Sequence, residues 1–136
     1  NTVGQILTYL MVSPPEEGSE PYQQYVQEKQ AILSALHEKA TMIKGAFEEM
    51  DGVECFGRVG AMYLFPRLNK LPIGTTDFDY CMNLLETTGL VTVNGSGFGQ
   101  KEGTHHLRIA FLPPREMLQE VLPAWVRFHN GYVGGG

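Results

Sequence analysis

Apolar and polar positions at the start of the chain follow helical spacing. Residues 2–12 carry apolar side chains at steps of three and four, which predicts a short helix that ends before Ser13-Pro14-Pro15. The acidic segment 14–18 has no periodicity and is expected to form a loop or hinge. A long second helix is expected from Ser19, its N-cap, to the stop at Asp51-Gly52. Its apolar stripe comprises Tyr22, Val26, Leu33, Leu36, Ala40, Ile43, Phe47 and Met50.

Beyond Gly52 short apolar runs alternate with helical patterns. Strands are expected over 53–56 and 61–66, joined by a tight turn, and a loop over 67–74. A helix should follow from its cap Thr76 to Thr88, then a strand over 90–93, a glycine-rich loop over 94–103 and a strand over 105–112. The last helix, after Pro114, should be kinked or broken at Pro123 and end in a flexible segment, 134–136. The helix after Thr76 is expected to bury Phe78, Cys81, Met82 and Leu85, and the last helix Leu118, Val121, Leu122, Trp125, Phe128 and Tyr132. This order predicts an α/β fold, a small sheet with helices largely on one face.

Length and charge narrow the class of protein. The 136 residues suffice for one core but not for two. A net charge of -5 without a basic run argues against nucleic-acid or anionic-membrane binding, and no apolar run reaches the length of a membrane span. Cys55 and Cys81 form no disulfide framework, which fits a reducing compartment. Because the chain opens with Asn1 and no leader, we expect it to be a piece of something longer.

The loop Gly95-Ser96-Gly97-Phe98-Gly99 is one place where chemistry could reside. Glycines allow backbone N–H groups to approach a phosphate, but a dinucleotide fingerprint must open a helix, and this loop leads into a strand. The Rossmann interpretation therefore fails. A mobile surface loop and a ligand-facing loop both remain open.

Arg108 is the second candidate. Alternation along 105–112 places Leu107, Ile109 and Phe111 on the core face and Arg108 on the opposite face. A guanidinium held by a strand offers two parallel hydrogen bonds to a carboxylate. A structural ion pair with an acidic side chain is the alternative, and position alone does not decide between them.

Other chemistry finds little support. His105 and His106 are neighbours in a strand and point to opposite faces, so no metal site is predicted. Glu16-Glu17 and Glu48-Glu49 are explained by solvated surface. Neither cysteine has a nearby histidine, which favours core positions over nucleophiles. The lysines, none of which looks desolvated enough for a Schiff base, are Lys29, Lys39, Lys44, Lys70 and Lys101. No catalytic residue is identified.

Several ordered motifs together resemble one enzyme family. The run from Gly95 to Thr104 followed by His106-Leu107-Arg108 and Phe111-Leu112-Pro113-Pro114 resembles the C-terminal part of alanine aminotransferases, which are fold type I pyridoxal-phosphate enzymes. Further similar runs, which extend the resemblance over nearly the whole chain, are Asn1 to Gln5, Gly60 to Arg67, and Tyr80 to Glu86. Two mild departures are Asn94, where the family usually has proline, and a shorter 67–76 loop.

The resemblance implies a fold, a reaction and partners. Residues 1–18 would end the large cofactor-binding domain and form a hinge, and 19–136 would form the long interdomain helix and the small C-terminal domain. Arg108 would bind the substrate α-carboxylate, with Ser96 and Phe98 as loop contacts. Pyridoxal 5'-phosphate, its Schiff-base lysine and its other ligands would belong to the part upstream of Asn1, so the chain alone is expected to be inactive.

The intact enzyme implied by this resemblance would be a homodimer that transfers the amino group between L-alanine and 2-oxoglutarate. It would be cytoplasmic, with the mitochondrion as the alternative, and its partners would be amino and keto acids rather than nucleic acid or membrane. Two other functions remain open: a non-catalytic module that senses an amino acid through Arg108, and a related aminotransferase of other specificity.

Overall fold

The computed structural model describes residues 1–135, so Gly136 of the expected flexible end lies outside the described residues. The chain divides into two compact units, 1–35 and 36–136. In the first unit, helix α1 (Thr2–Val12) has the predicted bounds, and the Asn1 side chain caps it by accepting from the Gly4 N–H at 3.2 Å. None of its residues is buried. Helix α2 (Tyr22–Glu48) begins in this unit and ends in the second.

Helix α2 starts at Tyr22, three residues after the predicted cap Ser19. The Ser19 hydroxyl donates to the Glu16 carbonyl at 2.6 Å, as does the Ser19 N–H at 3.0 Å. Ser19 therefore closes a turn and does not cap the helix, because its side chain competes for local backbone groups instead. The apolar stripe of α2 is buried only toward its C-terminal end, where the buried residues are Ala40, Ile43, Ala46 and Phe47.

The strands are short and all antiparallel. Strand β1 (Val53–Glu54) pairs with β3 (Arg67–Leu68), and a three-stranded sheet has the order β2 (Tyr63–Leu64), β5 (Leu107–Ala110), β4 (Val93–Asn94). One bridge between Arg67 and His106 continues β3 toward β5. The predicted hairpin between 53–56 and 61–66 is wrong, and 67–74 is not entirely loop. Long-range register with β5, rather than the intervening turn, decides the pairing of β2.

Helix α3 (Asp77–Thr88) has the predicted cap and stop. Thr76 and Asp79 form a capping box, and Gly89 ends the helix in the left-handed region at φ 77°. The predicted inward face is wrong for Phe78 and Met82, which are exposed, whereas Asp77, Tyr80, Cys81 and Leu84 are buried. The predicted and the observed buried residues both follow helical spacing. Tyr80 lies on the inner face because its hydroxyl has buried hydrogen-bond partners in α4.

Helix α4 (Arg115–Gly134) passes through Pro123 without the break that the sequence allowed. Because Pro123 has no N–H, the carbonyl of Gln119, four residues earlier, lacks its helical donor. Both residues are exposed, so water can donate to that carbonyl instead. The helix also includes Gly134, which had been assigned to the flexible end. Strand β4 lies later than the expected 90–93, and the glycine-rich loop contains a one-turn 3-10 helix, η1 (Gly95–Phe98).

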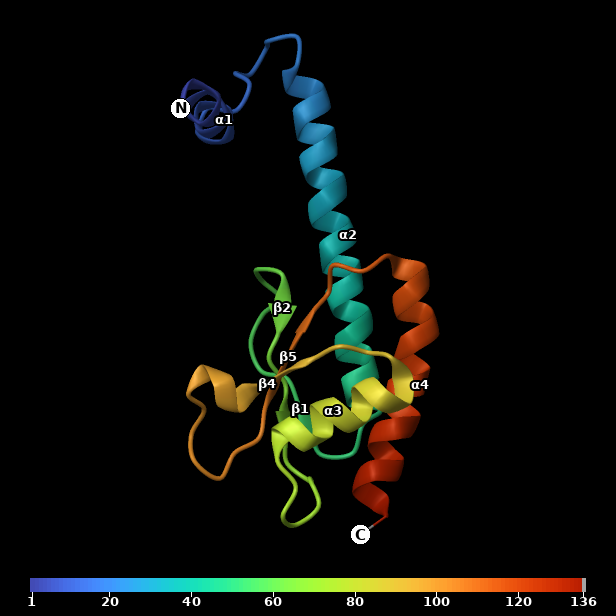
Figure 1. Ribbon diagram of the computed structural model, residues 1–136. Helices are drawn as coiled ribbons and strands as arrows, with labels where there is room; N and C mark the ends of the chain where they lie inside the picture. Colours follow the sequence, from blue (N-terminus) through green and yellow to red (C-terminus); the bar gives the residue numbers. More distant parts are fainter. Residues whose placement is uncertain (136) are drawn as a thin grey trace. The chain divides into compact units, whose positions relative to one another are not determined.

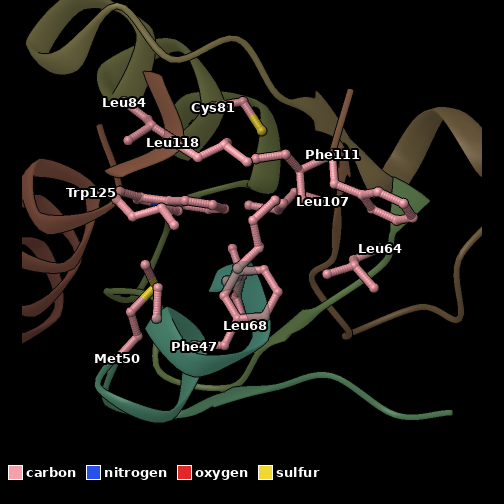
Figure 2. Packing of buried hydrophobic residues seen from close by; sticks show 14 of the residues in the cluster. Phe47, Met50, Leu64, Leu68, Cys81, Leu84, Leu107, Phe111, Leu118 and Trp125 are labelled. Carbon is pink, nitrogen blue, oxygen red and sulfur yellow. The ribbon is translucent and has the colours of Figure 1, made fainter. Parts of the chain in front are cut away.

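The core of the second unit lies between its helices and one face of the sheet (Figure 1). Figure 2 shows side chains from α2 and the turn after it, from α3, from α4, and from β5 and the residue after it meeting there. They include Phe47, Met50, Cys81, Leu84, Leu107, Phe111, Leu118 and Trp125. The Trp125 ring packs edge-on against Phe47 at 5.4 Å. This packing fixes β5, and with it the opposite face of the sheet.

Candidate functional site

Strand β5 places Arg108 on the face of the sheet that is turned away from the core. Leu107 and Ile109 are 0% and 3% exposed, whereas Arg108 between them is half-buried. Arg108 pairs with Val93 of β4, and its strand neighbour Ala110 pairs with Tyr63 of β2. Tyr63 is thus a diagonal neighbour of Arg108, within reach of a long side chain. The predicted alternation along this strand is confirmed.

Aromatic rings, not carboxylates, surround the Arg108 guanidinium. Its Cζ lies 4.8 Å from the centroid of the Phe98 ring and 5.3 Å from that of Tyr63. Within residues 1–135, ion pairs join Lys70 to Asp51 and Arg115 to Glu38, and no ion pair or side-chain hydrogen bond of Arg108 is found. The structural ion-pair alternative for Arg108 therefore has no partner in the part of the chain that the structure describes.

The glycine-rich loop is tightly folded against the start of β5. The Gly95 N–H donates to the His106 carbonyl at 2.7 Å. A Cβ at Gly95 would lie 2.6 Å from Gln100 Oε1 and 2.8 Å from the His106 carbonyl oxygen, so only glycine fits without displacement. Gly99 closes η1 in the left-handed region at φ 72°. The loop thus has a defined conformation next to Arg108.

Asp77 anchors this loop to helix α3. Its side chain is nearly fully buried, and Oδ2 accepts from the Ser96 N–H at 2.7 Å and from Gln100 Nε2 at 2.9 Å. Asp77 was not among the predicted site residues. Its contacts lie 19 and 23 residues away, and no local pattern signals them.

His106 extends the same network. Its ring stacks on Phe65 at 5.1 Å and 9°, and Nδ1 contacts Gln100 Oε1 at 3.0 Å. Because the Gln100 amide group donates to Asp77, its oxygen faces His106 and accepts from Nδ1–H. Burial, together with the nearby Arg67 charge, lowers the pKa of His106, which keeps the ring neutral near pH 7.

The structure brings some of the predicted site residues together. Phe98 contacts Arg108 directly, whereas the Ser96 hydroxyl faces the Asn94 side-chain amide and its N–H is held by Asp77. Tyr63 was not among the predicted site residues, although it lies in the run Gly60 to Arg67 that carries part of the resemblance. In residues 1–135 no cluster of three or more potential metal ligands occurs.

Three of the lysines contact oxygen atoms, and both cysteines are affected by burial. Lys39 and Lys44 each donate to a backbone carbonyl at 3.0 Å, of Leu112 and Gly57 respectively, and Lys70 pairs with Asp51 at 2.7 Å. Burial raises the pKa of Cys55 and of Cys81, which keeps both as thiols. Lys39, Lys44 and Lys70 are thus each held by a backbone carbonyl or a carboxylate, and both cysteines stay protonated.

Comparisons with known proteins confirm the resemblance. The chain is 41% identical to alanine aminotransferase 2 of Xenopus laevis over 96% of its own length and 43% identical to human alanine aminotransferase 1 over the same share. It is 41% identical to glutamate–glyoxylate aminotransferase 2 of Arabidopsis thaliana over 98% of its length. The chain spans only about a quarter to a third of these relatives: 26%, 28% and 30%. No family model matches it.

Solved structures agree on the fold. The chain superposes on the alanine aminotransferase of Pyrococcus furiosus with a TM-score of 0.77 and 28% identity, over 96% of this chain and 30% of that one. The aspartate aminotransferase of Rhizobium meliloti gives a TM-score of 0.72 at 21% identity over 98% of this chain and 32% of that one, which shows the fold alone. Within residues 1–135 no helix is long and apolar enough to cross a membrane.

Proposed function

Because this chain is similar in sequence to alanine aminotransferases and has the small-domain fold of fold type I aminotransferases, we propose that it forms the C-terminal part of an alanine aminotransferase. Residues 1–18 would end the large domain and form a hinge, and 19–136 would form the interdomain helix and small domain. The observation that carries the proposal is Arg108, held on the open face of β5 without an acidic partner in residues 1–135.

The whole enzyme would transfer the amino group between L-alanine and 2-oxoglutarate, giving pyruvate and L-glutamate. Bound pyridoxal phosphate would supply an electron sink for the substrate α-carbon. From the similarity to alanine aminotransferases, we assign the lysine and the other ligands of that cofactor to the rest of the protein. The isolated chain should then lack transaminase activity.

Arg108 would fix the substrate through its α-carboxylate. The planar guanidinium matches a carboxylate with two charge-assisted hydrogen bonds, and both the amino acid and the keto acid carry that group next to the reacting carbon. An arginine anchored by a strand whose other face is in the core is a rigid support. The role in the reaction is orientation, and no proton transfer is assigned to this residue.

The test is substitution of Arg108 in the full-length protein. Arg108→Ala should remove about 1.5–3 kcal/mol of charge-assisted bonding, which corresponds to a loss of roughly tenfold to a hundredfold in kcat/KM for L-alanine. Arg108→Lys should recover only part of this loss, because an ammonium cannot bind both oxygens in one plane. Arg127→Ala, which removes an exposed arginine of α4, is the matched control. Wild-type kinetics of Arg108→Ala would refute the assignment.

Two other functions make distinct predictions. The chain is as similar to a glutamate–glyoxylate aminotransferase as it is to alanine aminotransferase 2 of Xenopus laevis, at 41% identity. A transaminase that prefers glyoxylate as amino acceptor is therefore the second candidate. The ratio of kcat/KM for glyoxylate to that for 2-oxoglutarate distinguishes the two. A free-standing amino-acid sensor would bind L-alanine without cofactor. We expect calorimetry on the isolated chain to detect no such binding.

The remaining properties of the whole enzyme follow from the same proposal. We expect a homodimer, measurable by light scattering on the full-length protein. We expect a cytoplasmic protein. The mitochondrion is the alternative location, because the relatives include mitochondrial alanine aminotransferases of Dictyostelium discoideum and Arabidopsis thaliana.

A further inference from the structure

The arginine of the candidate site lies over two aromatic rings from different segments. Tyr63 comes from β2 and Phe98 from the end of η1, and both ring centroids are within the distance at which a cation is attracted to a ring face. We propose that Tyr63 and Phe98 form an aromatic clamp, a pair of positioning residues that holds the Arg108 guanidinium ready for a carboxylate. This inference rests on the proposed carboxylate-binding role of Arg108.

An aromatic clamp orients the guanidinium without competing for its donors. The N–H groups lie in the plane of the guanidinium and remain available, whereas a carboxylate neighbour would occupy the same fork that the substrate needs. A free arginine side chain samples many rotamers and loses that freedom on binding. A clamp that restricts these rotamers beforehand lowers the entropy cost of binding and so raises affinity for the carboxylate.

The Phe98 side of the clamp has its own support. The Phe98 ring packs edge-on against Phe65 at 5.9 Å and 84°, and Phe65 stacks on His106. The loop that carries Phe98 is tied to buried Asp77 through Ser96 and Gln100. Phe98 itself is half exposed, at 50%. A half-exposed ring held in place over a cation is better explained by a role in the site than by a contribution to the core.

The Tyr63 side is supported by the sheet. Strand pairing places Tyr63 opposite Ala110, and the small Ala110 side chain leaves room on the same face for Arg108 to reach the Tyr63 ring. Tyr63 is also half exposed, at 47%. The two rings are therefore fixed independently, one by strand register and one by the Asp77-anchored loop, so each can be tested by itself.

Steady-state kinetics of the full-length protein test the clamp. Phe98→Leu and Tyr63→Leu should each raise KM for L-alanine about threefold to tenfold while kcat changes less than twofold, because carboxylate binding is weakened equally in the ground and transition states. Phe98→Tyr and Tyr63→Phe keep the ring and should retain the wild-type KM. Phe56→Leu, which removes a ring that is 77% exposed and is not one of the two rings over which Arg108 lies, is the matched control.

Fluorinated phenylalanines at position 98 separate ring electrostatics from shape. Each added fluorine weakens the negative face of the ring with little change in size, so KM should rise stepwise with fluorination if the ring attracts the guanidinium. A ring that only packs the loop would leave KM unchanged. If Arg108→Ala raises KM but Phe98→Leu, Tyr63→Leu and the fluorinated series do not, the clamp is refuted and the proposed function stands. If Arg108→Ala itself has no effect, the proposed function fails.

Discussion

At the residue scale, the surroundings of Gly95 require a glycine, whereas those of Gly97 in the same loop do not. A methyl group at Gly95 would meet the Gln100 side-chain oxygen and the backbone of His106 at under 3 Å, whereas one at Gly97 meets nothing within 4 Å. Gly95→Ala should therefore lower the free energy of unfolding by about 1–3 kcal/mol, the usual cost of overpacking. Gly97→Ala should change it by less than about 0.5 kcal/mol. Urea unfolding of the chain measures both, and equal stabilities of the two variants would contradict the close packing at Gly95.

The residues of the candidate site divide into those that local pattern predicts and those that it does not. Alternation around Arg108 was sufficient to place it on the open face, because a strand has a fixed period of two. Asp77 and Tyr63 could not be found in this way. Their roles depend on contacts with residues far along the chain, Ser96 and Gln100 for Asp77 and Arg108 for Tyr63, and those contacts exist only after the strands have paired.

At the element scale, the capping box of α3 is the best-predicted boundary in the chain. The Asp79 N–H donates to the Thr76 hydroxyl oxygen at 3.1 Å, and the Thr76 N–H and hydroxyl both donate to the Asp79 carboxylate. These hydrogen bonds lower the pKa of Asp79. Thr76→Ala should destabilise the second unit by about 1 kcal/mol, whereas Thr87→Ala, inside the exposed end of the same helix, should be neutral or slightly stabilising. Thermal unfolding followed by circular dichroism distinguishes the two, and a neutral Thr76→Ala would exclude a stabilising cap.

Helix ends were better predicted than strand partners for a physical reason. A cap such as Thr76 with Asp79, or a left-handed Gly89, acts within four residues, so the sequence contains the whole signal. The strands have only two to four residues each, so their stability depends on their partners. The partners β2 and β5 lie more than forty residues apart in the sequence. Short strands carry weak sequence patterns. The glycines at 57 and 60 suggested a hairpin, but β2 pairs with the distant β5 instead.

At the scale of the whole second unit, a row of buried polar groups joins helices α3 and α4 to the turn that follows α2. Trp125 Nε1 donates to the Tyr80 hydroxyl at 3.0 Å, that hydroxyl contacts His129 Nδ1 at 2.9 Å, and His129 Nε2 contacts the Asp51 carbonyl at 2.9 Å. A carbonyl can only accept, so Nε2 carries the proton and Nδ1 accepts from Tyr80. The predicted apolar stripe of α4 omitted His129, because histidine is a polar residue whose burial depends on partners in α3 and in the turn after α2.

This chain of hydrogen bonds requires a neutral His129, which makes stability depend on pH. Burial lowers the pKa of His129 in the folded state, so below its unfolded value of about 6.5 the unfolded chain binds more protons than the native one. The free energy of unfolding should therefore fall as pH decreases from about 7 to 5. Each such histidine contributes a slope of at most about 1.4 kcal/mol per pH unit. His106, whose pKa is also lowered, contributes with the same sign.

Urea unfolding at a series of pH values, followed by the fluorescence of Trp125, the chain's single tryptophan, measures this dependence. His129→Gln should be less stable than wild type at pH 7, and its pH profile should be flatter between 5 and 7, because the titrating group has been removed. His37→Gln, which replaces an exposed histidine of α2, should keep the wild-type slope. An NMR titration provides a check that does not depend on a variant: the His129 ring signals should change to those of an imidazolium only at a pH below the ordinary histidine pKa of about 6.5. Parallel pH profiles for wild type and His129→Gln, or a His129 ring that titrates at the ordinary histidine pKa of about 6.5, would show that the buried hydrogen bonds tolerate a charged ring and that acid sensitivity arises elsewhere.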